Sequence, residues 1–148
     1  MPLPPAPPGG SDGNRPPQCR RRSRGGVRSY EQALGTNDVE TLNSLFRADP
    51  RTIRYGGGEN LYGHHAIARF RAARSPLGLA RSLSRTVITA YGRDAAVAST
   101  LFHRAASPGK VGRQMQTWIR FADGWRIVAA HVSMIDAEPS AEPAGSSR

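Results

Sequence analysis

The chain has 148 residues, which suits a single domain, and 21 Lys and Arg against 11 Asp and Glu give it a formal charge of +10. No apolar run approaches the roughly 18 residues of a membrane-spanning helix, and the single cysteine, Cys19, excludes an internal disulfide and a thiolate zinc cluster. The first residues form no apolar signal segment, so we expect a cytoplasmic protein.

Part of the basic excess lies at the N-terminus. Residues 1–29 hold six arginines and seven prolines, with one acidic residue. Segments of this composition bury too little apolar surface to fold, so the sequence predicts a disordered tail over 1–29, a folded domain over 30–136 and a second disordered tail over 137–148. A basic arm can bind nucleic acid, but the lack of aromatic residues in it favours a plain extension.

Helical segments dominate the first half of the predicted domain. Apolar spacing predicts helices over 30–35 and 37–50, and we expect Asn37 to cap the second, with Glu40 reaching back to it as in a capping box. A short hairpin with arms at 52–55 and 60–62 turns at three successive glycines. A third helix is predicted over 63–74, ended by the following Ser-Pro pair.

Four strands are predicted in the second half, and short turns join each to the next. These strands are Arg81–Tyr91, Ala95–Ala106, Gly112–Phe121 and Trp125–Ile135. Short turns between consecutive strands indicate an antiparallel meander. The sequence therefore predicts an α+β fold in which three N-terminal helices and a short hairpin pack on a curved antiparallel sheet and enclose a cone-shaped cavity.

The last predicted strand is apolar on both faces. If its residues alternate strictly, Trp125, Ile127, Ala129, His131, Ser133 and Ile135 point one way, and Val128, Ala130, Val132 and Met134 point the other. One face packs on the helices, and the other needs a cover that this chain does not supply. We therefore expect a homodimer through the sheet.

Two arginines share a face of the third helix with two apolar residues. Ile67, Phe70, Arg71 and Arg74 follow the spacing i, i+3, i+4 and i+7. A buried guanidinium needs an anionic partner, and acidic residues are scarce nearby, so a carboxylate-bearing ligand would suit the pair. Alternatively, both side chains extend along the helix edge to solvent.

Arg54 and Tyr30 are further candidates. Arg54 alternates with Ile53 and Tyr55 in a short strand, so it faces either the cavity, where it would hold a ligand, or solvent. Tyr30 belongs to an apolar helix stripe. Its hydroxyl could donate to a developing anion or transfer a proton, or simply bond to backbone within the core.

Polar residues also alternate along two predicted strands. Gln116 and Trp118 share a face, as do His131 and Ser133 in the next strand, which is typical of a cavity lining or of buried polar groups bonded to one another. No pair of carboxylates is placed for acid–base work, the adjacent His64 and His65 diverge on a helix, and no phosphate-binding loop is present.

Taken in order, the motifs resemble those of the AtzH-like/HpxZ family, within the SnoaL-like, nuclear-transport-factor-like (cystatin-like) superfamily. The resemblance covers residues 30–136 and rests on Tyr30-x-x-Ala33-Leu34-x-x-Asn37-Asp38, Leu42-x-x-Leu45-Phe46, Arg54-Tyr55-Gly56-x-x-Glu59-x-Leu61-x-Gly63, Ile67-x-x-Phe70-Arg71-x-x-Arg74, Gly112-Arg113-Gln114-x-Gln116-Thr117-Trp118, and Gly124-Trp125-Arg126-Ile127-Val128-Ala129-Ala130-His131-Val132-Ser133.

The resemblance implies the cone-shaped fold, a dimer, and a role in oxalurate, allophanate or cyanurate nitrogen catabolism. It further implies a decarboxylating amidohydrolase that acts on a small carboxylated urea such as 1,3-dicarboxyurea without a metal or other cofactor. The family's catalytic tyrosine and arginine fall on Tyr30 and Arg54. We expect Arg71, Arg74, Gln116, Trp118, His131 and Ser133 to contact the substrate.

Two rival functions remain open from the sequence. The same pocket could bind an oxalurate-like acid without turnover, or the dimer could dock on an amidase partner. A nucleic-acid binder, suggested by the charge alone, ranks behind both and predicts a steeply salt-dependent affinity.

Overall fold

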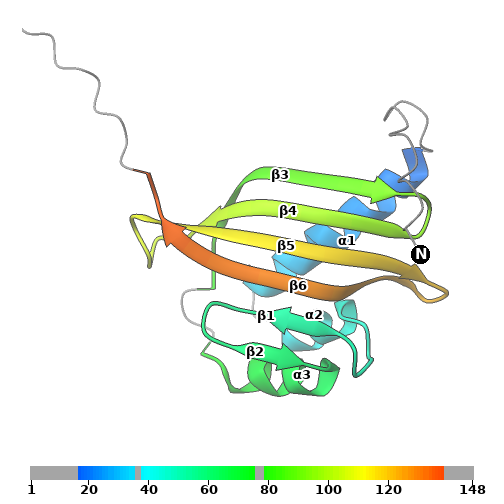
Figure 1. The fold of residues 1–148 in the computed structure, drawn as a ribbon, viewed down its shortest axis with the longest axis horizontal. Helices are drawn as coiled ribbons and strands as arrows, with labels where there is room; N and C mark the ends of the chain where they lie inside the picture. The colour runs from blue at the N-terminus through cyan, green and yellow to red at the C-terminus, as the bar shows by residue number, and fades with distance from the viewer. Residues whose placement is uncertain (1–16, 36–37, 76–78, 139–148) are drawn as a thin grey trace, which may run out of the picture.

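A computed structural model describes residues 17–35, 38–75 and 79–138, and it shows one sheet with helices packed on a single face (Figure 1). The helix α1 runs behind the sheet, and α3 lies beneath the hairpin at one sheet edge. In chain order the elements are α1 (Pro17–Gly35), α2 (Val39–Leu45), β1 (Ile53–Tyr55), β2 (Asn60–Tyr62), α3 (His64–Ala73), β3 (Ser82–Tyr91), β4 (Ala95–His103), β5 (Lys110–Phe121) and β6 (Gly124–Asp136).

The sheet has six strands in the order β2-β1-β6-β5-β4-β3. The predicted antiparallel meander from β3 to β6 is confirmed, as is the β1–β2 hairpin. The sequence did not indicate that β1 pairs in parallel with β6, with Arg54 opposite Ala130. Across the inner face this pairing creates one row of buried residues, Arg54, Ala130, Gln116 and Ala98, in which long and short side chains alternate.

A β-bulge in β6 overturns the strict alternation predicted for that strand. Trp118 pairs with Ile127 but Thr117 pairs with Ala129, so Val128 is an extra residue. Because the extra residue reverses the alternation, Ile127 and Ala130 both face the helices. The prediction that His131 and Ser133 share a face with Trp125 was therefore wrong.

The helix α1 begins earlier than predicted. It starts at Pro17 rather than near Tyr30. The boundary predicted after residue 29, between the tail and the folded domain, therefore lies within this helix. The apolar stripe of this helix continues back from Tyr30 to Val27, which is buried, and Gly26 lies against the ring of Trp118. The Arg-rich and Pro-rich composition concealed this continuation, because helix packing needed only one apolar residue and one glycine there.

The helix α2 is capped by Asp38, whose carboxylate accepts hydrogen bonds from the Thr41 backbone N–H at 3.1 Å and from its hydroxyl at 2.6 Å. The predicted cap, Asn37, lies outside the described residues. The helix ends at Leu45, and Phe46 is extended and forms a bridge to Ile127 of β6. This turn directs the buried Phe46 ring into the space between the helices and the sheet.

The two faces of the sheet differ in cover. The inner face carries the core, which includes Leu42, Phe46, Ile67, Trp118 and Ile127, each no more than 1% exposed. The outer face carries apolar side chains open to solvent: Tyr62 (62% exposed), Val87 (56%), Met115 (56%) and Ile135 (42%). No helix among the described residues is long and apolar enough to cross a membrane.

Two adjacent glycines test the packing of the early part of α1. A Cβ on Gly25 meets open space, whereas a Cβ on Gly26 would lie 2.9 Å from the Trp118 ring. We expect Gly25→Ala to raise the free energy of unfolding by about 1 kcal/mol, because alanine favours a helix. We expect Gly26→Ala to lower it by about 1 kcal/mol, because overpacking outweighs the helix gain. Urea denaturation of both variants measures the difference, and equal stabilisation by both would contradict this packing.

Candidate functional site

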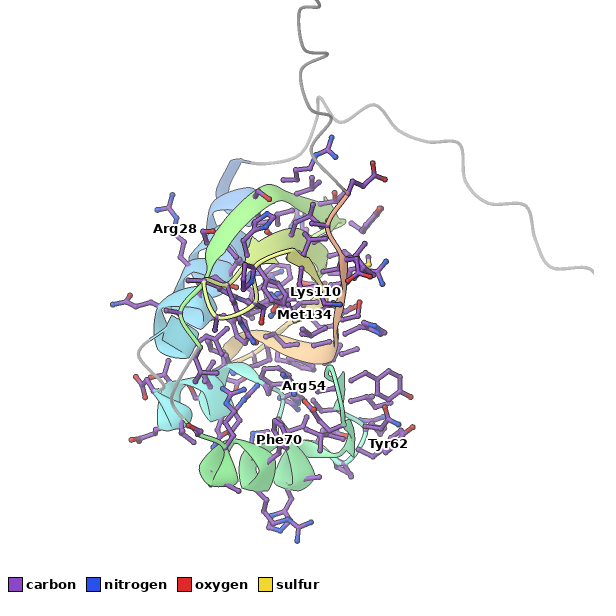
Figure 2. The ribbon with its side chains drawn as sticks, turned by 90° about the vertical axis from the view of Figure 1, so that its left-hand side faces the viewer. Arg28, Arg54, Tyr62, Phe70, Lys110 and Met134 are labelled. Atoms are coloured by element: carbon purple, nitrogen blue, oxygen red, sulfur yellow. The ribbon has the colours of Figure 1, made fainter. Side chains whose placement is uncertain are left out.

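Arg54 faces the interior, which settles the alternative left open by the sequence. It is 7% exposed, and its Nη1 donates to Glu59 Oε1 at 2.8 Å. The hairpin makes this contact possible because Gly56 has no Cβ, which would overlap the Glu59 carboxylate. Figure 2 shows Arg54 between β1 and α3 beside Phe70, whose ring centroid lies 5.6 Å from the Arg54 Cζ. The buried Nε of Arg54 has no hydrogen-bond partner.

Arg71 is the most deeply buried charged residue of α3, at 1% exposed. Its Cζ lies 4.3 Å from the centroid of the Phe46 ring, and its Nη1 donates to Asn43 Oδ1 over a long 3.4 Å. Its Nη2 is buried without a partner. Burial lowers the pKa of Arg71 to about 10, so the guanidinium is still charged at neutral pH.

Arg74 ends α3 and is only partly exposed. Its Nε and Nη2 are buried without hydrogen-bond partners. Burial lowers its pKa, and the positive charge of Arg54 lowers it further. Both helix arginines therefore turn inward rather than extend along the helix edge.

Two further arginines enter the site from the meander. Ser82 of β3 pairs with His103 of β4, so the residues just outside this pair, Arg81 and Arg104, are neighbours. Arg81 donates to Glu31 Oε1 at 2.6 Å and to Gln114 Oε1 at 2.8 Å. Sequence reasoning missed both arginines, although the antiparallel register of consecutive strands would have placed them together.

Arg104 differs from Arg81 in having no carboxylate partner among the described residues. Its Nε is buried without a hydrogen-bond partner, and burial lowers its pKa, with Arg81 as the next cause. Both guanidiniums lie by the same ring, since the Phe102 centroid is 4.3 Å from the Arg81 Cζ and 5.1 Å from the Arg104 Cζ. We call these five residues the arginine cluster: Arg54, Arg71, Arg74, Arg81 and Arg104.

Tyr30 lies near the arginines of α3 and also near the arginine that follows β4. It is 2% exposed on α1, with its ring centroid 6.2 Å from that of Phe46. Its phenol interacts electrostatically with Arg71 and Arg74 of α3 and with Arg104 at the end of β4. The Tyr30 hydroxyl group is therefore influenced by positive charges from two different elements, α3 and the end of β4.

A family model named AtzH-like matches residues 17–138. The chain belongs to the AtzH-like family. Its match begins at Pro17, where α1 begins, which agrees with the earlier helix start.

Solved structures are similar to this AtzH-like chain over most of its length. A protein with unknown function from the DUF3225 family of Pectobacterium atrosepticum is 52% identical over 82% of this chain and 94% of that one, with a TM-score of 0.79. A cystatin-like fold protein of Burkholderia xenovorans is 45% identical over 82% and 95%, also with a TM-score of 0.79. A nuclear transport factor 2-like protein of Salmonella enterica is 25% identical over 84% and 96%, with a TM-score of 0.66. No curated protein matches the chain.

These matches confirm the predicted cystatin-like, nuclear-transport-factor-like fold.

The predicted polar site residues of the strands lie on different faces of the sheet in this AtzH-like chain. Gln116 and Trp118 are buried on the inner face, where the Trp118 Nε1 donates to Gln116 Oε1 at 3.0 Å. His131 and Ser133 are on the outer face instead. His131 is exposed beside the Tyr55 ring, and Ser133 accepts hydrogen bonds from Arg113. The structure therefore does not bring these two residues to the arginine cluster.

Charge is the dominant property of this AtzH-like site. Arg54 is paired with Glu59, and Arg81 is paired with Glu31. Arg71, Arg74 and Arg104 form no ion pair with any carboxylate in the described ranges. Because a cation that is wholly or partly buried without an ion pair is costly, a small anion would suit these three guanidiniums.

Replacing Arg71 separates stability from binding. We expect Arg71→Met to raise the free energy of unfolding by about 1 kcal/mol, because it removes a buried charge without leaving a carboxylate unpaired. We expect Arg81→Met to lower it by about 3 kcal/mol, because Glu31 then loses its partner. Chemical denaturation without ligand measures both. Destabilisation of the Arg71 variant to the same extent as the Arg81 variant would show that the Arg71 charge is already compensated.

Proposed function

We propose that this AtzH-like protein is a metal-independent, decarboxylating amidohydrolase that acts on a small carboxylated urea such as 1,3-dicarboxyurea. The observation that carries the proposal is the set of three guanidiniums around Tyr30 that form no ion pair with a carboxylate in the described ranges and have buried nitrogen atoms without partners. A small dianion with planar carboxylates suits this set, because guanidinium groups bind carboxylates in a bidentate manner.

The chemistry that such a substrate undergoes needs an acid more than a base. In 1,3-dicarboxyurea the bond between one terminal carboxyl carbon and its nitrogen breaks, and carbon dioxide departs. The bonding electron pair goes to the nitrogen, which takes one proton, so the other product is allophanate. Nothing is oxidised or reduced, and the net consumption is one proton per turnover.

The residues around the cluster favour this proton delivery. Glu59 is engaged by Arg54, and Glu31 by Arg81, so neither carboxylate is free to activate water. Tyr30 carries an O–H group among the guanidiniums, and we assign it the transfer of the proton to the departing nitrogen. Arg54, with its unpartnered Nε, stabilises the negative charge that moves onto the urea group.

The proposal includes a cytoplasmic role in nitrogen catabolism, in the oxalurate, allophanate or cyanurate neighbourhood. The second candidate function is a non-catalytic binder of an oxalurate-like acid, or a partner of an amidase. One observation favours this alternative: guanidiniums without carboxylate partners attract an anionic ligand whether or not that ligand reacts. Turnover separates the two candidates, because a binder is stabilised by ligand but releases no carbon dioxide.

Tyr30→Phe and Arg54→Gln test the catalytic assignment. We expect kcat for 1,3-dicarboxyurea to fall about 100-fold or more in each, because one removes the proton donor and the other a charge-stabilising group. Carbon dioxide release and allophanate formation measure turnover. We expect KM to change less for Tyr30→Phe than for Arg54→Gln, since the phenol acts mainly on the departing nitrogen.

Arg120→Gln is the matched control, because Arg120 is a partly exposed arginine that pairs with Asp94 away from the arginine cluster. Its turnover should equal that of the unchanged protein. If the unchanged protein releases no carbon dioxide but gains thermal stability from oxalurate-like acids, the binding alternative replaces the enzyme.

We also propose that the outer face of the sheet binds a second copy of this chain. Register places Tyr55, His131, Met115 and Val87 on that face, with Ser99 between the last two. Met115 and Val87 are each 56% exposed, and an apolar sheet face of this extent is typical of an interface between protein chains.

A charge at the centre of this face tests the dimer. We expect Met115→Asp to convert a dimer to a monomer in sedimentation velocity, because the interface would bury an unpaired carboxylate. Ala122→Asp places the same charge in the exposed β5–β6 turn and should leave the dimer intact. A monomeric unchanged protein would contradict the proposal directly.

A further inference from the structure

We propose that Arg104 is the specificity-determining residue for a second anionic end of the ligand, so that this site selects dianions over monoanions. The inference rests on the proposed function for the identity of the site but not on its turnover. It starts from the distribution of guanidiniums that lack carboxylates, which occur at two separate places around Tyr30.

The first place is α3, where Arg71 and Arg74 both have buried nitrogen atoms without partners. A single carboxylate bound here would satisfy two guanidiniums at once. Since Arg54 is already paired with Glu59, these helix arginines are the strongest site for one negative charge. A monoanion would therefore occupy this end.

The second place is the end of β4, where Arg104 lacks a carboxylate although its neighbour Arg81 has one. The Arg81 Nη2 donates to both Glu31 and Gln114, so the Arg81 side chain is already bound within the protein. Arg104 forms no ion pair with a carboxylate in the described part of the chain. Its buried Nε is a donor without a partner, and Arg104 comes from a different element than α3 although its charge lowers the pKa of Arg74.

Phe102 fixes where Arg104 lies. The fully buried ring contacts Gly112, at which a Cβ would overlap it, so the ring cannot shift in that direction. The Arg104 Cζ lies 5.1 Å from the ring centroid on this fixed support. The aromatic ring positions the guanidinium without neutralising it, which leaves the charge available to a ligand.

Strand order sets the distance between the two ends. β6 and β5 lie between β1, which carries Arg54, and β4, which leads into Arg104. Three strand spacings separate β1 from β4 by about 14 Å. Arg104 also lies beyond Ala98, the β4 residue in the row of Arg54, so the two backbones are further apart still and only the long arginine side chains bring the charges near each other. A short ligand with a carboxylate at each end can engage both places, whereas a ligand with one carboxylate leaves Arg104 unused.

Glutarate and butyrate test the inference, because they differ by one carboxylate and contain no bond that the proposed reaction would break. Isothermal titration calorimetry on the full chain should show glutarate binding about 10- to 100-fold more tightly than butyrate, the worth of one charge-assisted contact. We expect Arg104→Met to remove this difference by weakening glutarate alone. Arg71→Met should weaken both ligands, and Arg104→Lys should keep part of the preference.

Arg113→Met is the matched control, because Arg113 lies on the outer face bound to Ser133 and should leave both affinities unchanged. Circular dichroism confirms that each variant is folded. Equal binding of the two ligands by the unchanged protein, or an equal loss of both in Arg104→Met, would overturn the inference. A lost glutarate preference without any turnover of 1,3-dicarboxyurea would support Arg104 as the selector and reject only the enzyme.

Discussion

Burial of guanidinium groups without carboxylates is the constraint on which the rest of this structure depends. Three arginines contribute such groups, from the end of β4 and from α3. Aromatic rings hold them in place: Phe46 supports Arg71, and Phe102 supports Arg104. A ring face attracts a cation by about 1–2 kcal/mol, which orients the charge but offsets only part of its desolvation. The fold keeps these charges because the surrounding apolar core is stable enough to do so.

The same aromatic residues belong to the core and to the site, which ties the two together. Phe46 packs among the core residues and also supports Arg71, while Trp118 packs against Gly26 and bonds to Gln116. Two glycines, Gly26 and Gly112, give these large rings their space. Packing defects here would therefore displace charges as well as reduce stability.

The sequence predicted the strands of the meander, α3, and two arginines on one face of α3, because alternation, helical spacing and turn residues are local signals. It left open whether those arginines face the interior, which depends on how α3 packs. It missed the start of α1, where basic composition hid a short apolar stripe. It also missed the bulge at Val128, which arises from the fit between β5 and β6 and not from either strand alone. Arg81 and Arg104 carry no local pattern, so only the register of β3 against β4 brings them to the site.

The alternating row across the inner face has a consequence for how this scaffold changes over evolution. Arg54 and Gln116 are separated by Ala130, and Ala98 follows on the next strand. The two alanines are the small members of that row, and neither carries charge or a hydrogen-bonding side chain. A larger apolar side chain at either position would change the shape of the inner face without adding or removing a charge. The shape of the inner face and its charge are thus encoded by different residues and can diverge independently among chains that share this fold.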